Sequence, residues 1–126
     1  MKIFFTNLKG YEDRKNFMIK QLSDFKLDYE IIDCIDGRNW EEDYIKSIVT
    51  PKLFEMYHRY KEAWLTKGAI AATLTHVELI YKKIVAENIE YALVLEDDVT
   101  LNKDFPALLE KLEKHLYHNK MEEVVL

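Results

Sequence analysis

The pattern of apolar and polar residues changes along the chain between two forms, one typical of strands and one typical of helices. Three short apolar runs are typical of buried strands: residues 2–7, 29–34 and 91–95. Three longer stretches repeat apolar residues every three or four positions, which predicts helices over 12–25, 69–87 and 105–118. Alternating strands and helices predict an α/β fold with a mostly parallel sheet flanked by helices.

The helical spacing also predicts which side chains face the core. The expected stripes are Met18, Leu22 and Phe25, then Ile70, Leu74, Val77, Tyr81 and Ile84, then Phe105, Leu108, Leu109, Leu112 and Leu116. Thr50-Pro51 fits the start of one more helix, whose face would carry Leu53, Tyr57, Tyr60 and Trp64. The aromatic-rich stretch 40–64 could form core, an acceptor surface or an interface. The last residues, EEVVL, resemble the beginning of a fourth strand.

Composition limits the class of protein. The chain has 126 residues, 48% of them hydrophobic, which suits a single domain over 1–126 with a core of its own. Its formal net charge of −5 argues against nucleic acid as the main partner. No apolar run reaches the length of a transmembrane segment, and Cys34 is the single cysteine. We expect a cytoplasmic protein, one that can also lie peripherally at the inner membrane.

Three adjacent carboxylates, Glu96, Asp97 and Asp98, directly follow the strand YALVL. Ligands of parallel sheets bind beyond the carboxyl ends of the strands, so chemistry is expected there. In extended backbone Glu96 and Asp98 would point to one side and Asp97 to the other. Glu96 and Asp98 can then hold Mn²⁺ or Mg²⁺, since these ions bind carboxylate oxygens together with substrate phosphates. Acidic residues after a strand can also simply solvate a loop, and the pattern leaves both alternatives open.

Two other positions fit a site at this edge of the sheet. Asn7 ends the first strand, and Arg14 lies in the first turn of the next helix. The helix dipole disfavours a cation at that end, and a bound anion would reverse the balance. Pairing of Arg14 with Glu12, Asp13 or another acid is the ordinary alternative. His76 lies beside the apolar stripe of its helix, where a structural or surface role is the usual one.

The order of these motifs resembles glycosyltransferase family 25, the bacterial lipooligosaccharide galactosyltransferases and their animal collagen-galactosyltransferase relatives. The resemblance rests on Asn7-Leu8, Asp13-Arg14 and Asp36-Gly37, followed by TKGAIAATLTH and YALVLEDDV. It covers most of residues 2–105. The chain departs from the family pattern at Ala69, at Ala71-Ala72 and at Thr75. Family members usually continue for about another hundred residues, so we expect this chain to be the N-terminal half of a truncated domain.

The resemblance implies a GT-A type nucleotide-sugar-binding fold with the first strand at its centre. Asn7, Leu8 and Arg14 would border the nucleotide, and Asp97 and His76 would lie near the donor. Glu96 and Asp98 would hold Mn²⁺ or Mg²⁺ against the diphosphate. The implied reaction is an inverting transfer of a hexose, galactose above all, from a UDP-sugar to a saccharide acceptor in lipooligosaccharide or lipopolysaccharide biosynthesis. The catalytic base stays unassigned.

Two alternatives come from other classes of protein. LVLEDDVTL is similar to the haloacid dehalogenase-type phosphatase motif, although Glu96 then stands where an aspartate nucleophile is needed. A non-catalytic binding module of the same fold is the other alternative. An open sheet edge would let such a module pair with a second copy of itself.

Overall fold

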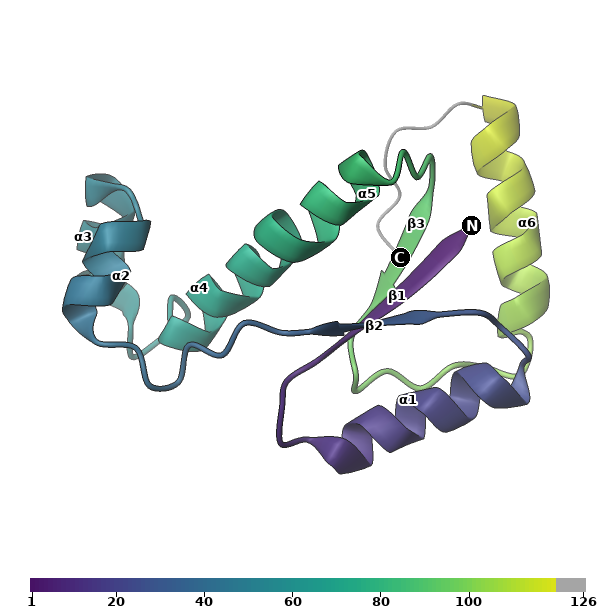
Figure 1. Cartoon of the computed structure of the whole chain (residues 1–126), viewed down its shortest axis with the longest axis horizontal. Helices are drawn as coiled ribbons and strands as arrows, with labels where there is room; N and C mark the ends of the chain where they lie inside the picture. Colours follow the sequence, from purple (N-terminus) through teal and green to yellow (C-terminus); the bar gives the residue numbers. More distant parts are fainter. Residues whose placement is uncertain (120–126) are drawn as a thin grey trace.

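The computed structural model of the chain describes residues 1–119 (Figure 1). Its elements follow in the order β1 (Lys2–Asn7), α1 (Glu12–Asp24), β2 (Glu30–Asp33), α2 (Glu42–Ile48), α3 (Pro51–Tyr60), α4 (Lys67–Leu74), the π-helical segment η1 (Thr75–Tyr81), α5 (Lys82–Ala86), β3 (Ala92–Leu95) and α6 (Phe105–Asn119). The predicted strands and helices are confirmed, and α2 is an addition. The fourth strand expected in EEVVL lies outside the described residues.

The three strands form one parallel sheet in the order β2-β1-β3. The predicted central place of β1 is therefore confirmed. The register sets Phe5 beside Leu95 and Asn7 beside Asp33, so all three strands end at the same edge of the sheet. That edge receives Asn7, the turn after β2 and the carboxylates after β3.

Helices cover both faces of the sheet, which explains why β1 is an almost continuous apolar run. Ile3 and Phe5 pack with Met18 and Leu22 of α1 and with Leu109 of α6. On the opposite face Phe4 packs with Ile32 and Ile80. Figure 1 shows α1 and α6 apart from the long α4–α5 helix, with the sheet between them. The described part is an α/β fold of a three-stranded parallel sheet flanked by helices.

A second apolar cluster lies in the aromatic-rich stretch, so core is the correct interpretation for part of it. Ile45, Tyr57, Leu65 and Ile70 are buried together. Thr50 caps α3, because its hydroxyl accepts a hydrogen bond from the Leu53 amide at 3.2 Å, and Pro51 occupies the first turn as predicted. The helix ends at Tyr60, however, and Trp64 is 57% exposed, so its predicted place on a helical face is wrong.

The apolar stripe predicted over 69–87 is wrong at Val77 and Tyr81, whereas Ile84 packs against the core of the sheet as predicted. Helical backbone does run without a break from Lys67 to Ala86, but Thr75–Tyr81 is a π-helix. Its wider turns rotate the following side chains relative to an α-helix. Val77 and Tyr81 are therefore exposed, and Ile80 is buried in their place. In α6, Leu109 and Leu116 are buried as expected, whereas Leu108 is exposed.

None of the helices within residues 1–119 is long and apolar enough to cross a bilayer.

Candidate functional site

A cavity of about 290 Å³ opens at the edge of the sheet where the three strands end. This volume is at the lower end of the range found for small-molecule sites. Its walls come from the ends of the strands, the start of α1 and the helix α4–η1: Thr6, Leu8, Tyr11, Arg14, Cys34, Ile35, Asp36, Gly37, Arg38, Gly68, Ala71, Ala72, Thr75, His76, Glu96 and Asp97. Small residues of α4 line one wall and leave room for a ligand.

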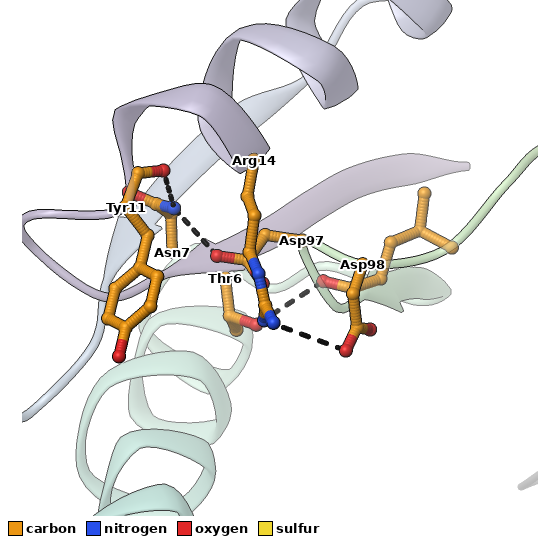
Figure 2. A network of polar contacts seen from close by, with 7 residues as sticks. Thr6, Asn7, Tyr11, Arg14, Asp97 and Asp98 are labelled. Carbon is orange, nitrogen blue, oxygen red and sulfur yellow. Dashed lines mark hydrogen bonds and ion pairs between the residues drawn. The ribbon is translucent and has the colours of Figure 1, made fainter.

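Asn7 holds Asp97 at the floor of this site. The Asn7 side chain is buried, and its Nδ2 donates to Asp97 Oδ2 at 2.7 Å (Figure 2). The same amide donates to the Tyr11 carbonyl at 3.3 Å. One side chain thereby joins the end of β1, the entrance of α1 and the turn after β3. Hydrogen bonds of a buried side-chain amide stabilise a polar network more than those of an exposed amide, because water competes less for its donors.

Arg14 faces the same carboxylate from α1. Its Nη1 lies 3.4 Å from Asp97 Oδ1 and 3.7 Å from Asp98 Oδ2 (Figure 2). The ordinary alternative for Arg14, pairing with an acid, is therefore confirmed. Its partners are Asp97 and Asp98 in the turn after β3, which is distant from Arg14 in sequence. These two carboxylates also offset the cost of a cation in the first turn of a helix. The repulsion among three adjacent carboxylates is thus relieved in part by Asn7 and Arg14.

The side chains of the three acids after β3 do not point alternately to opposite sides, as those of strand residues would. β3 ends at Leu95, and Asp97 and Asp98 lie in a turn. The expectation that Asp97 points away from Asp98 is wrong, because both side chains reach Arg14. Glu96 and Asp97 line the cavity, whereas Asp98 lies at its rim with a side chain that is 57% exposed.

The opposite wall is the turn after β2. Arg38 binds Asp36 in a bidentate manner, with Nε–Oδ1 at 2.9 Å and Nη2–Oδ2 at 2.7 Å. The hydrogen bonds from Arg38 hold the pKa of Asp36 at about 2, below its ordinary value of 3.8. Gly37 between them is buried, and a Cβ there would lie 2.8 Å from the Lys67 carbonyl oxygen. Only glycine lets this turn approach α4 so closely.

Thr75 ties the same turn to the long helix. Its hydroxyl accepts from the Ile35 amide at 3.0 Å and donates to the Ala71 carbonyl at 3.0 Å. With 1% of its surface exposed, Thr75 is among the most buried polar residues in the described part of the chain. It is also the first residue of the π-helical segment, and the next residue, His76, lines the cavity. The helix therefore presents His76 to the cavity from a firmly anchored position.

Cys34 lies in the wall of the cavity but is held as a thiol. Burial raises its pKa, and the negative charges of Asp97 and Glu96 act in the same direction. Thr6 opposes this effect through a hydrogen bond. A thiol whose pKa is raised is a poor nucleophile at neutral pH, so the site is not arranged for cysteine chemistry.

The carboxylates fit a divalent cation only with ligands from elsewhere. Among residues 1–119, no group of three or more His, Cys, Asp or Glu side chains is arranged to hold a metal ion. Mg²⁺ and Mn²⁺ commonly use one or two carboxylates and complete their shell with water and substrate phosphates. The oxygen donors of Glu96 and Asp98 are of the right chemical type for such a shared site.

The predicted residues assemble at one edge of the sheet. Leu8, Arg14, His76, Glu96 and Asp97 line the cavity, while Asn7 supports it from below and Asp98 flanks it. Tyr11, Asp36 and Arg38 also line the cavity, although no role was predicted for them from the sequence. Asp36 and Arg38 follow the carboxyl end of a strand, as Asn7 and Glu96 do, so the same reasoning could have found them.

Comparison with known proteins places the sequence in context. Residues 1–125 match the family described as "Glycosyltransferase family 25 (LPS biosynthesis protein)". Human procollagen galactosyltransferase 2 is 30% identical over 111 residues, which are 88% of this chain and 18% of that protein. A glycosyltransferase 25 family member from Aedes aegypti is 33% identical over 82% of this chain and 17% of its own length. Human inactive glycosyltransferase 25 family member 3 is 27% identical over 95% of this chain and 20% of its own. The chain spans about a fifth of the length of these relatives.

Proposed function

Because this chain belongs to glycosyltransferase family 25, we propose that it forms the nucleotide-sugar-binding part of a hexosyltransferase. The donor is a UDP-sugar, with galactose as the transferred hexose, as the names of the procollagen galactosyltransferases suggest. The acceptor is a saccharide of lipopolysaccharide or lipooligosaccharide, because the family description names LPS biosynthesis. Membership of this family speaks against the phosphatase alternative.

The network of Asn7, Asp97 and Arg14 beside the cavity is the observation that carries this proposal. It joins the carboxyl ends of β1 and β3, where ligands of parallel α/β sheets bind. A nucleotide offers a diphosphate to Arg14 and polar base and ribose groups to the walls of the cavity. Leu8 and His76 lie in those walls and supply contacts to the nucleotide and the sugar.

Transfer of the hexose requires three events. The acceptor hydroxyl oxygen bonds to the anomeric carbon, the bond from that carbon to the diphosphate oxygen breaks, and a base takes the hydroxyl proton. The residues of this chain bind and orient the donor and favour the negative charge of the departing UDP through Arg14. We assign no residue of this chain as the base. Displacement from the side opposite the diphosphate inverts the anomeric configuration.

The proposed donor site also includes a divalent cation, Mn²⁺ or Mg²⁺. Glu96 and Asp98 would hold it at the rim of the cavity. When bound, the cation supplies positive charge that neutralises the diphosphate and acts as a Lewis acid. Arg14 also contacts Asp98, so binding of the cation would compete with this ion pair.

Titration calorimetry of UDP, with Mn²⁺ and with EDTA, tests donor binding. The proposal expects weak binding in EDTA and tighter binding with Mn²⁺, because carboxylates and a diphosphate repel one another without a cation. Glu96→Gln and Asp98→Asn should each weaken the effect of Mn²⁺, because each removes one proposed carboxylate ligand of the cation. The matched control is Asp28→Asn, an exposed acid in the loop before β2. If the unmodified chain binds no UDP in either condition, the donor-binding proposal fails for this chain.

A non-catalytic binding module is the second candidate, and one observation favours it. A relative that matches 95% of this chain is named inactive, so the shared region occurs in a protein without transferase activity. A module of this kind would bind UDP and release no UDP from UDP-galactose in the presence of saccharide acceptors. A coupled assay for UDP release separates it from the transferase.

A further inference from the structure

Two arginines approach one aromatic ring at the cavity. The guanidinium carbon of Arg14 lies 5.4 Å from the centroid of the Tyr11 ring, and that of Arg38 lies 5.8 Å from the same centroid. These distances are within the range in which a guanidinium is attracted to an aromatic ring. All three residues line the cavity, although Tyr11 directly precedes α1, Arg14 lies in its first turn and Arg38 lies in the turn after β2.

Arg38 is held in place more firmly than an ordinary surface arginine. The bidentate contact with Asp36 fixes the plane of the guanidinium, and the backbone amide of Arg38 also donates to Asp36 at 3.0 Å. The hydrogen bonds from Arg38 also lower the pKa of Asp36 to about 2. The close approach of Gly37 to α4 fixes the backbone of the turn. A side chain that is already ordered loses less entropy when it binds a ligand.

The contact with Asp36 leaves donors for a second anion. A guanidinium has five N–H groups in a rigid fork, and the contact uses Nε–H and one N–H of Nη2. Half of the Arg38 side chain is exposed. Arginine binds phosphate oxygens through paired, charge-assisted hydrogen bonds that a lysine cannot reproduce.

We propose that Arg38 and Arg14, supported by Tyr11, form a clamp for the diphosphate of the donor nucleotide. This inference rests on the proposed function and adds a binding residue from the side of the cavity opposite the acidic turn. Two like charges beside one ring repel each other, and a diphosphate that contacts both removes this repulsion. The clamp acts on the phosphates, so it contributes to the binding of UDP and of inorganic pyrophosphate but not of uridine.

Calorimetric titration with these three probes tests the clamp in EDTA and in Mn²⁺. Arg38→Gln should weaken the binding of UDP and pyrophosphate about tenfold and leave uridine unchanged, because charge-assisted hydrogen bonds to phosphate are lost. Arg38→Lys keeps the charge but not the fork, and an intermediate loss is expected. Arg59→Gln is the matched control, since Arg59 forms an exposed ion pair with Glu55 on α3. Circular dichroism verifies that each variant is folded.

The outcomes separate the clamp from the proposed function. If the unmodified chain binds UDP and Arg38→Gln binds it equally well, the clamp is wrong and donor binding stands. If pyrophosphate binds in an Arg38-dependent manner but UDP does not bind, the clamp stands and the proposed donor is wrong. If neither probe binds to the unmodified chain, both proposals are overturned.

Discussion

The side-chain amide of Asn7 donates to Asp97 Oδ2 at 2.7 Å, across 90 residues of sequence. Asn7 is 2% exposed and the Asp97 side chain 13% exposed, so water is a poor substitute for either partner. This contact joins the central strand to the acidic turn and sets the position of the carboxylate that Arg14 also contacts.

Asn7→Ala should lower the free energy of unfolding by about 1–3 kcal/mol, because it leaves a largely buried carboxylate without its amide donor. Urea denaturation followed by circular dichroism measures the change. Asn16→Ala is the control, since Asn16 is exposed on α1, and it should change stability by less than about 0.5 kcal/mol. Equal effects of the two substitutions would show that the contact with Asp97 contributes nothing.

Glu96→Gln and Asp98→Asn should each reduce the tightening of UDP binding by Mn²⁺ and leave stability nearly unchanged. Both side chains are exposed, and exposed acids contribute little to folding. Asp97→Asn should affect the metal dependence less and stability more, because Asp97 contacts Asn7 and Arg14. Calorimetry with and without Mn²⁺, together with thermal melts, measures both quantities. An unaltered Mn²⁺ effect in the first two variants would remove them from the proposed metal site.

Gly37→Ala should destabilise the fold by about 1–3 kcal/mol, the usual cost of an inserted methyl group in a packed interior. The new Cβ would lie 2.8 Å from the Lys67 carbonyl oxygen and 2.9 Å from Ala71 Cβ. Gly68→Ala is the matched control, because its Cβ would meet only Thr66 Oγ1, at an ordinary 3.5 Å. Alanine is also the better helix former, so the control should be neutral or slightly stabilising. Chemical denaturation measures the stability of both variants, and equal stabilities would contradict the tight packing of Gly37 against α4.

Thr75→Val should lower the free energy of unfolding by about 1–3 kcal/mol, because the partly buried Ile35 amide loses its acceptor. Thr75→Ser keeps the hydroxyl and should recover most of this loss. Thr73→Val provides the control from the same helix, since the Thr73 hydroxyl donates to Ala69 in a similar way but is exposed. A Thr75→Val protein as stable as Thr73→Val would show that the link to the turn after β2 is energetically unimportant. Denaturant midpoints are sufficient for the comparison.

The pKa of Asp36 should rise from about 2 toward 3.8 in Arg38→Gln, because hydrogen bonds from Arg38 are the main cause of its lowering. A carboxyl whose pKa is lower in the folded state than in the unfolded state stabilises the fold at pH values above the pKa of the unfolded state. This contribution is therefore complete above about pH 4 and is lost as the pH falls toward 2. Carboxyl NMR titration of both proteins measures the two pKa values. A pKa near 3.8 in the unmodified chain would mean that the bidentate contact does not persist in solution.

The sequence by itself determined the layers of the fold. The short apolar runs at 2–7, 29–34 and 91–95 predicted strands of a covered sheet, and the helical stretches between them predicted parallel connections. The same logic placed Asn7 and Glu96 at one edge, since parallel strands end together. Thr50-Pro51 marked the start of α3 because capping is a local interaction.

Only the tertiary structure decided how that edge becomes a site. The turn at Asp97–Asp98 is set by Asn7 and Arg14, which are distant in sequence, so strand alternation could not predict where the acids point. The π-helical segment moves Val77 and Tyr81 out of the core, because its phase depends on packing against the sheet and on the anchor at Thr75. Tyr11 and Arg38 come together only when α1 and the turn after β2 meet at the cavity. Local pattern predicted the strands and most of the helices, whereas contacts between distant elements determine where the polar side chains point.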